Sequence, residues 1–161
     1  MARIEQQLEK LGVTLPEVAK PAGAYVPAVQ SGEYVYTSGQ LPFVDGEPQV
    51  TGRLGDGMSV EDGYEAAKIA AVNALAAIKS VIGDLDDVEQ VVKVVGFVNS
   101  AADFTDHPKV INGASEFLGE VFGARGKHAR SAVGVAALPM GTPVEVEMIV
   151  KVRSSETKPG L

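Results

Sequence analysis

The run from Val88 to Val98 is the feature that most constrains how this chain folds. Its central letters, VVKVVGFV, are apolar at nearly every position. A strand with one buried face alternates polar and apolar side chains, whereas a strand covered on both faces reads as a continuous apolar run. We therefore expect this run to lie at the centre of a sheet, with other elements beside it and on both of its faces.

Two segments with the 3.6-residue spacing of helices flank that strand in the sequence. The first covers residues 59–82 and opens with the letters SVED, a capping-box pattern in which Ser59 caps the helix. The second covers residues 106–122 and has Pro108 in its first turn, where proline is favoured. A shorter amphipathic helix is expected over residues 3–11.

Strand patterns occupy both ends of the chain, at residues 25–30, 33–38, 131–138 and 144–152. Residues 40–57 are rich in Gly, Pro and Asp, and they are expected to form a loop with short strand pieces. The element order is then β-β-α-β-α-β-β after the short helix. Pairing of sequence neighbours predicts an α+β fold with one mixed sheet, a hairpin at each end and both long helices on one face. Because no further long helix remains, a second copy of the chain is expected to cover the other face.

The composition narrows the classes of function. The 161 residues suit one domain, taken as residues 1–161 with an N-terminal extension at 1–20 and a flexible tail at 153–161. The 14 Lys and Arg against 21 Asp and Glu give a net charge of −7, which argues against non-specific binding to nucleic acid. The absence of Cys excludes disulfides, thiolate zinc sites and cysteine nucleophiles.

The N-terminus does not have the pattern of a signal peptide. Glu5 and Glu9 stand where such a peptide needs an apolar core, and no run of the sequence approaches the length of a membrane span. We therefore expect a cytoplasmic protein that does not enter a membrane.

Most motifs that carry chemistry are absent. The glycines of GRLGDG, residues 52–57, lack the spacing and the Lys of a phosphate-binding loop. Ser115 falls inside the second predicted helix rather than in a G-x-S-x-G turn. The two histidines, His107 and His128, would need carboxylates from elsewhere to hold a metal ion, so no metal site is expected.

Arg130 is the exception, because it stands at the mouth of the apolar strand at residues 131–138. A guanidinium carries a rigid fork of donors that fits a carboxylate with two parallel hydrogen bonds. A structural pair with Asp or Glu is the more common role for a strand-edge arginine, and the residues alone leave both roles open. Glu145 and Glu147 share one face of the last strand, and a hairpin would return Glu145 toward Leu138 rather than to Arg130. Whether Arg130 and Glu145 meet across a subunit boundary is not fixed by their spacing.

Four segments of the sequence resemble motifs of a known protein family and occur in the same order. The letters RSAVGVAALPMGTPVEVEMI, which begin at Arg130, closely resemble the C-terminal signature of the RidA/YjgF family, the reactive intermediate deaminases formerly labelled endoribonuclease L-PSP. PAGAYVPAV from Pro21, VYTSGQLP from Val35 and VINGA from Val110 are similar to earlier motifs of the family, in the same order. The resemblance extends from about Pro21 to Lys151.

The resemblance implies the family's chorismate-mutase-like fold, assembled into trimers with active sites in clefts between subunits. It also implies hydrolysis of 2-imino or enamino acids to 2-keto acids and ammonia, with no metal or organic cofactor. Arg130 matches the arginine that binds the substrate carboxylate, and Glu145 matches the glutamate that positions the attacking water. Five further positions match residues at the family's site: Tyr25, Ser38, Gly39, Asn112 and Ala132.

The chain also departs from the family pattern. His128 stands where better-known members carry a proline, and Gly134 stands where glutamate is often found. The N-terminal helix and the loop at residues 40–57 place it in a longer branch of the family, of about 150 residues.

Two other functions remain open. One is a non-enzymatic trimer that binds carboxylate ligands or proteins. The other is the endoribonuclease or translation inhibitor of the older label, which the net charge of −7 disfavours.

Overall fold

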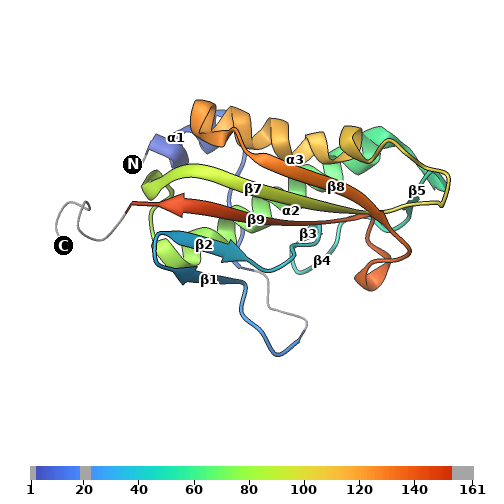
Figure 1. The fold of residues 1–161 in the computed structure, drawn as a ribbon, viewed down its shortest axis with the longest axis horizontal. Coiled ribbons are helices and arrows are strands. Elements are labelled where there is room, and N and C mark those ends of the chain that lie inside the picture. The colour runs from blue at the N-terminus through green and yellow to red at the C-terminus, as the bar shows by residue number, and fades with distance from the viewer. Residues whose placement is uncertain (1–2, 19–22, 154–161) are drawn as a thin grey trace.

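The computed structural model describes residues 3–18 and 23–153, and the fold is α+β, as predicted (Figure 1). Its main sheet has the strand order β1-β2-β9-β7-β8. These strands are β1 (Ala28–Ser31), β2 (Tyr34–Thr37), β7 (Val88–Asn99), β8 (Ala129–Val135) and β9 (Val144–Val152). The long helices α2 (Val60–Ile82) and α3 (His107–Phe122) lie across one face of the sheet, and the short α1 (Arg3–Lys10) packs beside α3 (Figure 1).

The loop before α2 contains short pairs of strands, also as predicted. They are β3 (Phe43–Val44) with β4 (Glu47–Pro48), and β5 (Arg53–Leu54) with β6 (Gly57–Met58). Three single turns of 3-10 helix complete the elements: η1 (Leu85–Asp87), η2 (Gly123–Gly126) and η3 (Pro139–Gly141). No helix of the described residues is long and apolar enough to cross a membrane. Pro21 and Ala22 of the early motif, and residues 154–161 of the expected tail, lie outside the described residues.

Helix α2 forms where the sequence predicts it because both of its ends are capped. The Ser59 hydroxyl accepts a hydrogen bond from the backbone N–H of Asp62 at 3.1 Å, and Gly83 ends the helix with φ of 84°. Its buried face consists largely of alanine: Ala66, Ala67, Ala70, Ala71, Ala74 and Ala77. These small side chains let α2 approach both β9 and α3 closely, which forms the core between helices and sheet.

The predicted C-terminal hairpin is wrong, because β8 and β9 do not pair with each other. Strand β8 pairs in parallel with β7 through the crossover helix α3, and β9 lies antiparallel between β7 and β2. The burial of the two strands explains this order. Alternate residues of β9, from Val144 to Val152, are all buried under the helices, whereas β8 offers Arg130, Ala132 and Gly134 at the equivalent positions. The more apolar strand occupies the centre.

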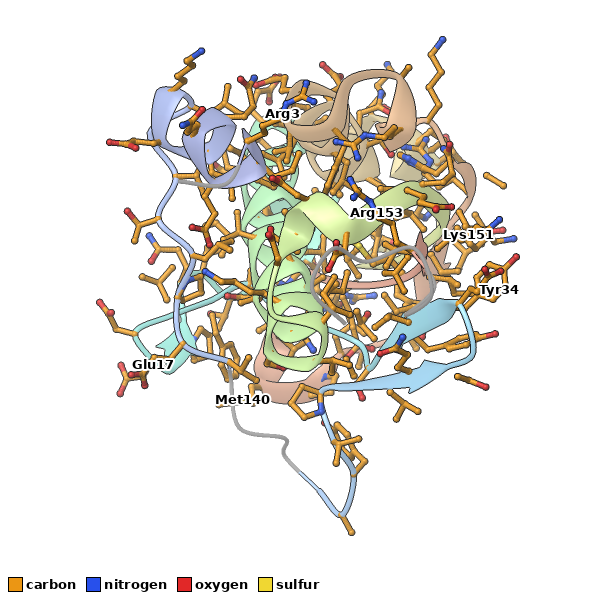
Figure 2. The ribbon with its side chains drawn as sticks, turned by 90° about the vertical axis from the view of Figure 1, so that its left-hand side faces the viewer. Arg3, Glu17, Tyr34, Met140, Lys151 and Arg153 are labelled. Carbon is orange, nitrogen blue, oxygen red and sulfur yellow. The ribbon has the colours of Figure 1, made fainter. Side chains whose placement is uncertain are left out.

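One face of the sheet is not covered by the described residues. Strand β7 has strands on both sides, but Val95 and Phe97 on its outer face are only half-buried, so the expectation of cover on both faces does not hold within one chain. Tyr34 and Lys151, paired neighbours on β2 and β9, project from this face in Figure 2. Its exposed apolar side chains are Val29, Tyr34, Tyr36 and Val133. Cover by a second copy of the chain remains a prediction.

Candidate functional site

Arg130 lies on β8 and is held by three hydrogen bonds to α3. Its Nη1 donates to the Oδ1 of Asn112 at 2.8 Å and to the Oγ of Ser115 at 3.1 Å, while Nη2 donates to the carbonyl of Pro108 at 3.4 Å. The structure therefore brings together two residues that the sequence singled out, Arg130 and Asn112. Among the described residues, no carboxylate forms an ion pair with Arg130. Arg130 is therefore not paired with a structural Asp or Glu in the described part of the chain.

Ala132 belongs to the same surface as Arg130. The register pairs Arg130 with Val94 and Ala132 with Gly96, and these positions of β7 face the helices. Ala132 is half-buried and packs against the core. We call Arg130, Asn112 and Ala132 the Arg130 group.

Glu145 lies on the uncovered face of the sheet, where it is paired with Phe97. Its side chain packs against the backbone of Gly39, because a Cβ added to Gly39 would lie 2.7 Å from the Glu145 Cδ and 2.9 Å from Oε2. Glycine is therefore required at position 39 if the Glu145 carboxyl is to keep this place. Burial, and then the Glu147 carboxylate on the same strand face, raise the pKa of Glu145 above its ordinary value of 4.5.

Hydrogen bonds hold the loop around Gly39 to β9 on one side and to the segment before β1 on the other. Strand β2 stops pairing with β9 after Tyr36, and the chain rejoins β9 at Gln40, which exchanges two backbone hydrogen bonds with Val146. Ser38 lies in between; its hydroxyl donates to the carbonyl of Val26 at 2.5 Å and its N–H donates to Pro27 at 2.8 Å.

These bonds tie the segment before β1 to the loop. Tyr25, the residue before Val26, is 52% exposed and belongs to that segment. We call Glu145, Ser38, Gly39 and Tyr25 the Glu145 group.

Arg130 and Glu145 lie on opposite faces of the sheet within one chain. Arg130 points to α3, whereas Glu145 stands on the face that no described residue covers. The prediction that Arg130 and Glu145 need not meet within one chain is consistent with this arrangement. A single site built from both groups requires two chains.

Sequence reasoning missed Ser115, which bonds to Arg130, and His128, which bonds to Ser115. The Oγ of Ser115 is 2.8 Å from the Nε2 of His128, and the His128 Nδ1 is 2.6 Å from the carbonyl of Gly126. From the sequence alone, Ser115 is a helix residue outside a G-x-S-x-G turn, and His128 is a histidine without carboxylate companions for a metal and a departure from the family's proline. The available signal was the spacing of Asn112 and Ser115, since residues three apart lie on one face of a helix.

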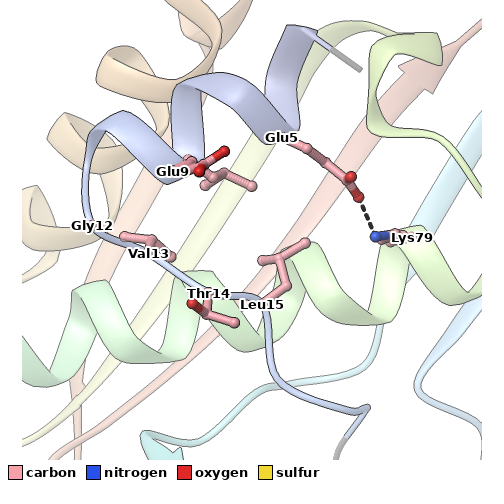
Figure 3. Close-up of a pocket in the computed structure, with 8 residues that line it drawn as sticks. Glu5, Glu9, Gly12, Val13, Thr14, Leu15 and Lys79 are labelled. Atoms are coloured by element: carbon pink, nitrogen blue, oxygen red, sulfur yellow. Dashed lines mark hydrogen bonds and ion pairs between the residues drawn. The ribbon is translucent and has the colours of Figure 1, made fainter. Parts of the chain in front are cut away.

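A cavity of about 520 Å³ lies between α1, the segment after it and α2, and no residue of either group lines it (Figure 3). Glu5 and Lys79, the charged groups at one end, are joined in an ion pair across it (Figure 3). Among the described residues, no group of three or more His, Asp or Glu side chains gathers as a metal site would require.

Gly134 has a local reason to be glycine in this chain. The Nε2 of His107 and the Oγ of Ser100 are 3.1 Å apart and share a hydrogen bond beside the backbone of Gly134. A Cβ added at this position would lie 2.5 Å from the His107 Nε2 and 2.7 Å from the Ser100 Oγ. A glutamate, which the resemblance leads us to expect here, would require the His107 and Ser100 side chains to move from this arrangement.

The comparisons with known proteins agree with this geometry. The family model described as "YjgF/chorismate mutase-like, putative endoribonuclease" matches residues 5–151. The chain belongs to the RidA/YjgF family. Its mixed sheet with helices on one face is the chorismate-mutase-like fold of that family, as the resemblance implied.

Relatives cover the chain almost from end to end. Protein TCP17 of Trypanosoma cruzi is 44% identical over 153 residues, which are 94% of this chain and 96% of that protein. A 2-iminobutanoate/2-iminopropanoate deaminase of Dermatophagoides farinae is 34% identical over 139 residues, 86% of this chain and 93% of that protein. The crystal structure of Atu1372, a protein of unknown function from Agrobacterium tumefaciens, is 43% identical and superposes with a TM-score of 0.87. That match covers 94% of this chain and 93% of the other.

A substitution at Gly134 tests the close approach of His107. We expect Gly134→Ala to lower the free energy of unfolding by about 0.5–1.5 kcal/mol, because the new methyl group displaces the His107–Ser100 pair and its hydrogen bond is lost. Gly119→Ala is the matched control, since a Cβ at this helical position meets nothing within 4 Å. It should raise stability by about 0.5–1 kcal/mol. Urea unfolding of both variants measures the difference, and a neutral Gly134→Ala would contradict the prediction.

The raised pKa of Glu145 predicts a stability that depends on pH. The folded chain keeps the Glu145 proton at pH values where the unfolded chain has released it. The free energy of unfolding therefore falls as the pH rises through this window, and the loss is complete above the raised pKa. Glu145→Gln should consequently gain more stability over the natural chain at pH 7 than at pH 4. Urea unfolding at both pH values checks this, with Glu47→Gln on β4 as control; an equal gain at both would refute it.

Proposed function

We propose that this protein hydrolyses 2-imino or enamino acids to 2-keto acids and ammonia. The observation that carries the proposal is the Arg130 guanidinium, which is held by neutral groups of α3 and has no carboxylate partner among the described residues. In a chain with 21 acidic residues, a guanidinium without an acidic partner is suited to a carboxylate that arrives with a ligand. The 34% identical deaminase supports the reaction class.

The proposed chemistry asks for a bound carboxylate and one directed water. Arg130 binds the substrate carboxylate, and Glu145 positions the water that attacks the imine carbon. Addition of water gives a carbinolamine, the nitrogen takes up a proton, and ammonia leaves as the carbonyl forms. Because its pKa is raised, the Glu145 carboxyl is better suited than an ordinary glutamate to pass a proton from the water to the nitrogen. No metal or organic cofactor takes part in these steps.

We further propose that the site lies between the subunits of a homotrimer. Arg130 and Glu145 face opposite sides of one sheet, so one chain supplies Arg130 and its neighbour supplies Glu145. Such a head-to-tail contact forms a closed ring when its rotation closes after three copies, which is the trimer proposed. The uncovered sheet face, with Val29, Tyr36 and Val133 exposed, is the surface that we expect the neighbours to bury.

Competition for imino acids tests the reaction. An amino-acid oxidase generates 2-imino acids of several side-chain sizes, and semicarbazide traps them unless the protein hydrolyses them first. We expect the natural chain to lower the yield of trapped product. Arg130→Ala should be at least about tenfold less effective, because charge-assisted hydrogen bonds to the carboxylate are lost. No competition with any substrate would favour the non-enzymatic binding trimer, and RNA cleavage by the natural chain that both Arg130→Ala and Glu145→Gln abolish would favour the older label.

Mixing two inactive variants tests the shared site. Arg130→Ala and Glu145→Gln chains are unfolded together in equal amounts and refolded, so that subunits from both sources assemble at random. If each site takes Arg130 from one subunit and Glu145 from the next, about a quarter of the sites regain both residues and activity returns to that level. The same variants refolded separately are the controls. A mixture that stays inactive would place both residues of the site in one chain.

A further inference from the structure

Arg130 is connected to His128 through Ser115, and the direction of the hydrogen bonds can be assigned. The carbonyl of Gly126 can only accept, so the His128 Nδ1, 2.6 Å away, carries a proton. In the neutral imidazole Nε2 then has no proton, and it accepts from the Ser115 hydroxyl at 2.8 Å. The Ser115 oxygen in turn accepts from the Arg130 Nη1 at 3.1 Å.

This connection determines which donors of Arg130 remain for a ligand. Nη1 has two N–H groups, and they are taken by Asn112 at 2.8 Å and Ser115 at 3.1 Å. One N–H of Nη2 is directed at the Pro108 carbonyl at 3.4 Å, so the second Nη2 N–H and the Nε–H are the donors left for a carboxylate, at the edge that Nε and Nη2 form. If Nη1 lost its fixed partners, the guanidinium could rotate and present different edges.

Packing against α3 fixes Gly126, whose carbonyl oxygen accepts the hydrogen bond from His128. Gly126 lies in η2, directly after α3, and is buried. A Cβ added there would lie 2.5 Å from the carbonyl oxygen of Leu118, so the backbone of Gly126 is pressed against α3. The carbonyl that holds His128 therefore cannot shift easily, and His128 is tied to the helix on which Asn112 and Ser115 also stand.

We infer that Ser115 and His128 are positioning residues for Arg130. Ser115 occupies one N–H of Nη1 and His128 fixes the Ser115 hydroxyl, so that the edge formed by Nε and Nη2 faces the carboxylate of the ligand. This inference rests on the proposed function in one respect, that the ligand of Arg130 is a carboxylate. It assigns to His128 a role in this chain that the proline of better-known family members cannot have, because proline has no side-chain donor or acceptor.

Binding of a product-like keto acid tests the inference without turnover. Isothermal titration with 2-oxobutanoate gives the dissociation constant for the natural chain and four variants. Ser115→Ala removes the central link and His128→Phe removes the acceptor while keeping a ring. We expect each to weaken binding about 3–10-fold, the range that follows from the loss of one such hydrogen bond. His128→Gln, whose Oε1 can replace the Nε2 acceptor, should stay within about twofold.

Ser80→Ala is the matched control, because the Ser80 hydroxyl bonds within its own helix, to Ala77, and lies outside the Arg130 group. Its binding should equal that of the natural chain. Where imine hydrolysis is measurable, Ser115→Ala and His128→Phe should raise KM with kcat nearly unchanged, which a general loss of folded protein would not do. The ¹⁵N spectrum of the His128 ring should show a protonated Nδ1 and a bare Nε2.

The outcomes separate the inference from the proposed function. Unchanged affinity in both Ser115→Ala and His128→Phe, or a protonated Nε2 in the neutral ring, would overturn the inference alone. Binding of 2-oxobutanoate that weakens as expected, in a protein without imine hydrolysis, would overturn the proposed function and support the inference. A natural chain that binds no keto acid would overturn both.

Discussion

The insertion of β9 between β2 and β7 is the constraint on which the rest of the structure depends. Without it, the N-terminal pair β1-β2 and the parallel pair β7-β8 would be two separate ribbons. Its inner residues, from Val144 to Val152, bury the alanine face of α2, and its outer residues include Glu145. One strand therefore joins the sheet, completes the core and carries a functional side chain, since alternate residues of a strand face opposite sides.

Features encoded by local chemistry could be predicted from the sequence. Ser59 and Gly83 delimit α2 because a hydroxyl cap and a left-handed glycine act within a few residues. The order of strands in the sheet could not be predicted in the same way. Residues 139–143 resemble a hairpin turn, and only the competition between β8 and β9 for the buried centre excludes the hairpin, which is a property of the whole core.

The geometry of the candidate site, like the strand order, could not be predicted from local sequence. The sequence pattern singled out Arg130 and Glu145 and the resemblance suggested their roles, but their placement on opposite faces depends on the registers of β8 and β9 against β7. Ser115 and His128 are 13 positions apart, and the hydrogen bonds that join Arg130 to Ser115 and Ser115 to His128 depend on how α3 ends at η2. No motif marks such contacts, because each residue has an ordinary role when viewed alone. Tertiary geometry converts a helix serine and a loop histidine into neighbours of a guanidinium.

The position of β9 also has a consequence for biosynthesis. Because β9 follows both β2 and β7 in the chain but lies between them in the sheet, those two strands are made first and keep open edges until β9 has been made and inserted. Unpaired edges of apolar strands are the surfaces through which nascent chains associate wrongly. The many sequence-distant contacts of β9 further slow the final step, because the ends of a long loop must find each other first. A ribosome that stalls before Val144 would hold a chain with two incomplete halves of a sheet and no means of joining them.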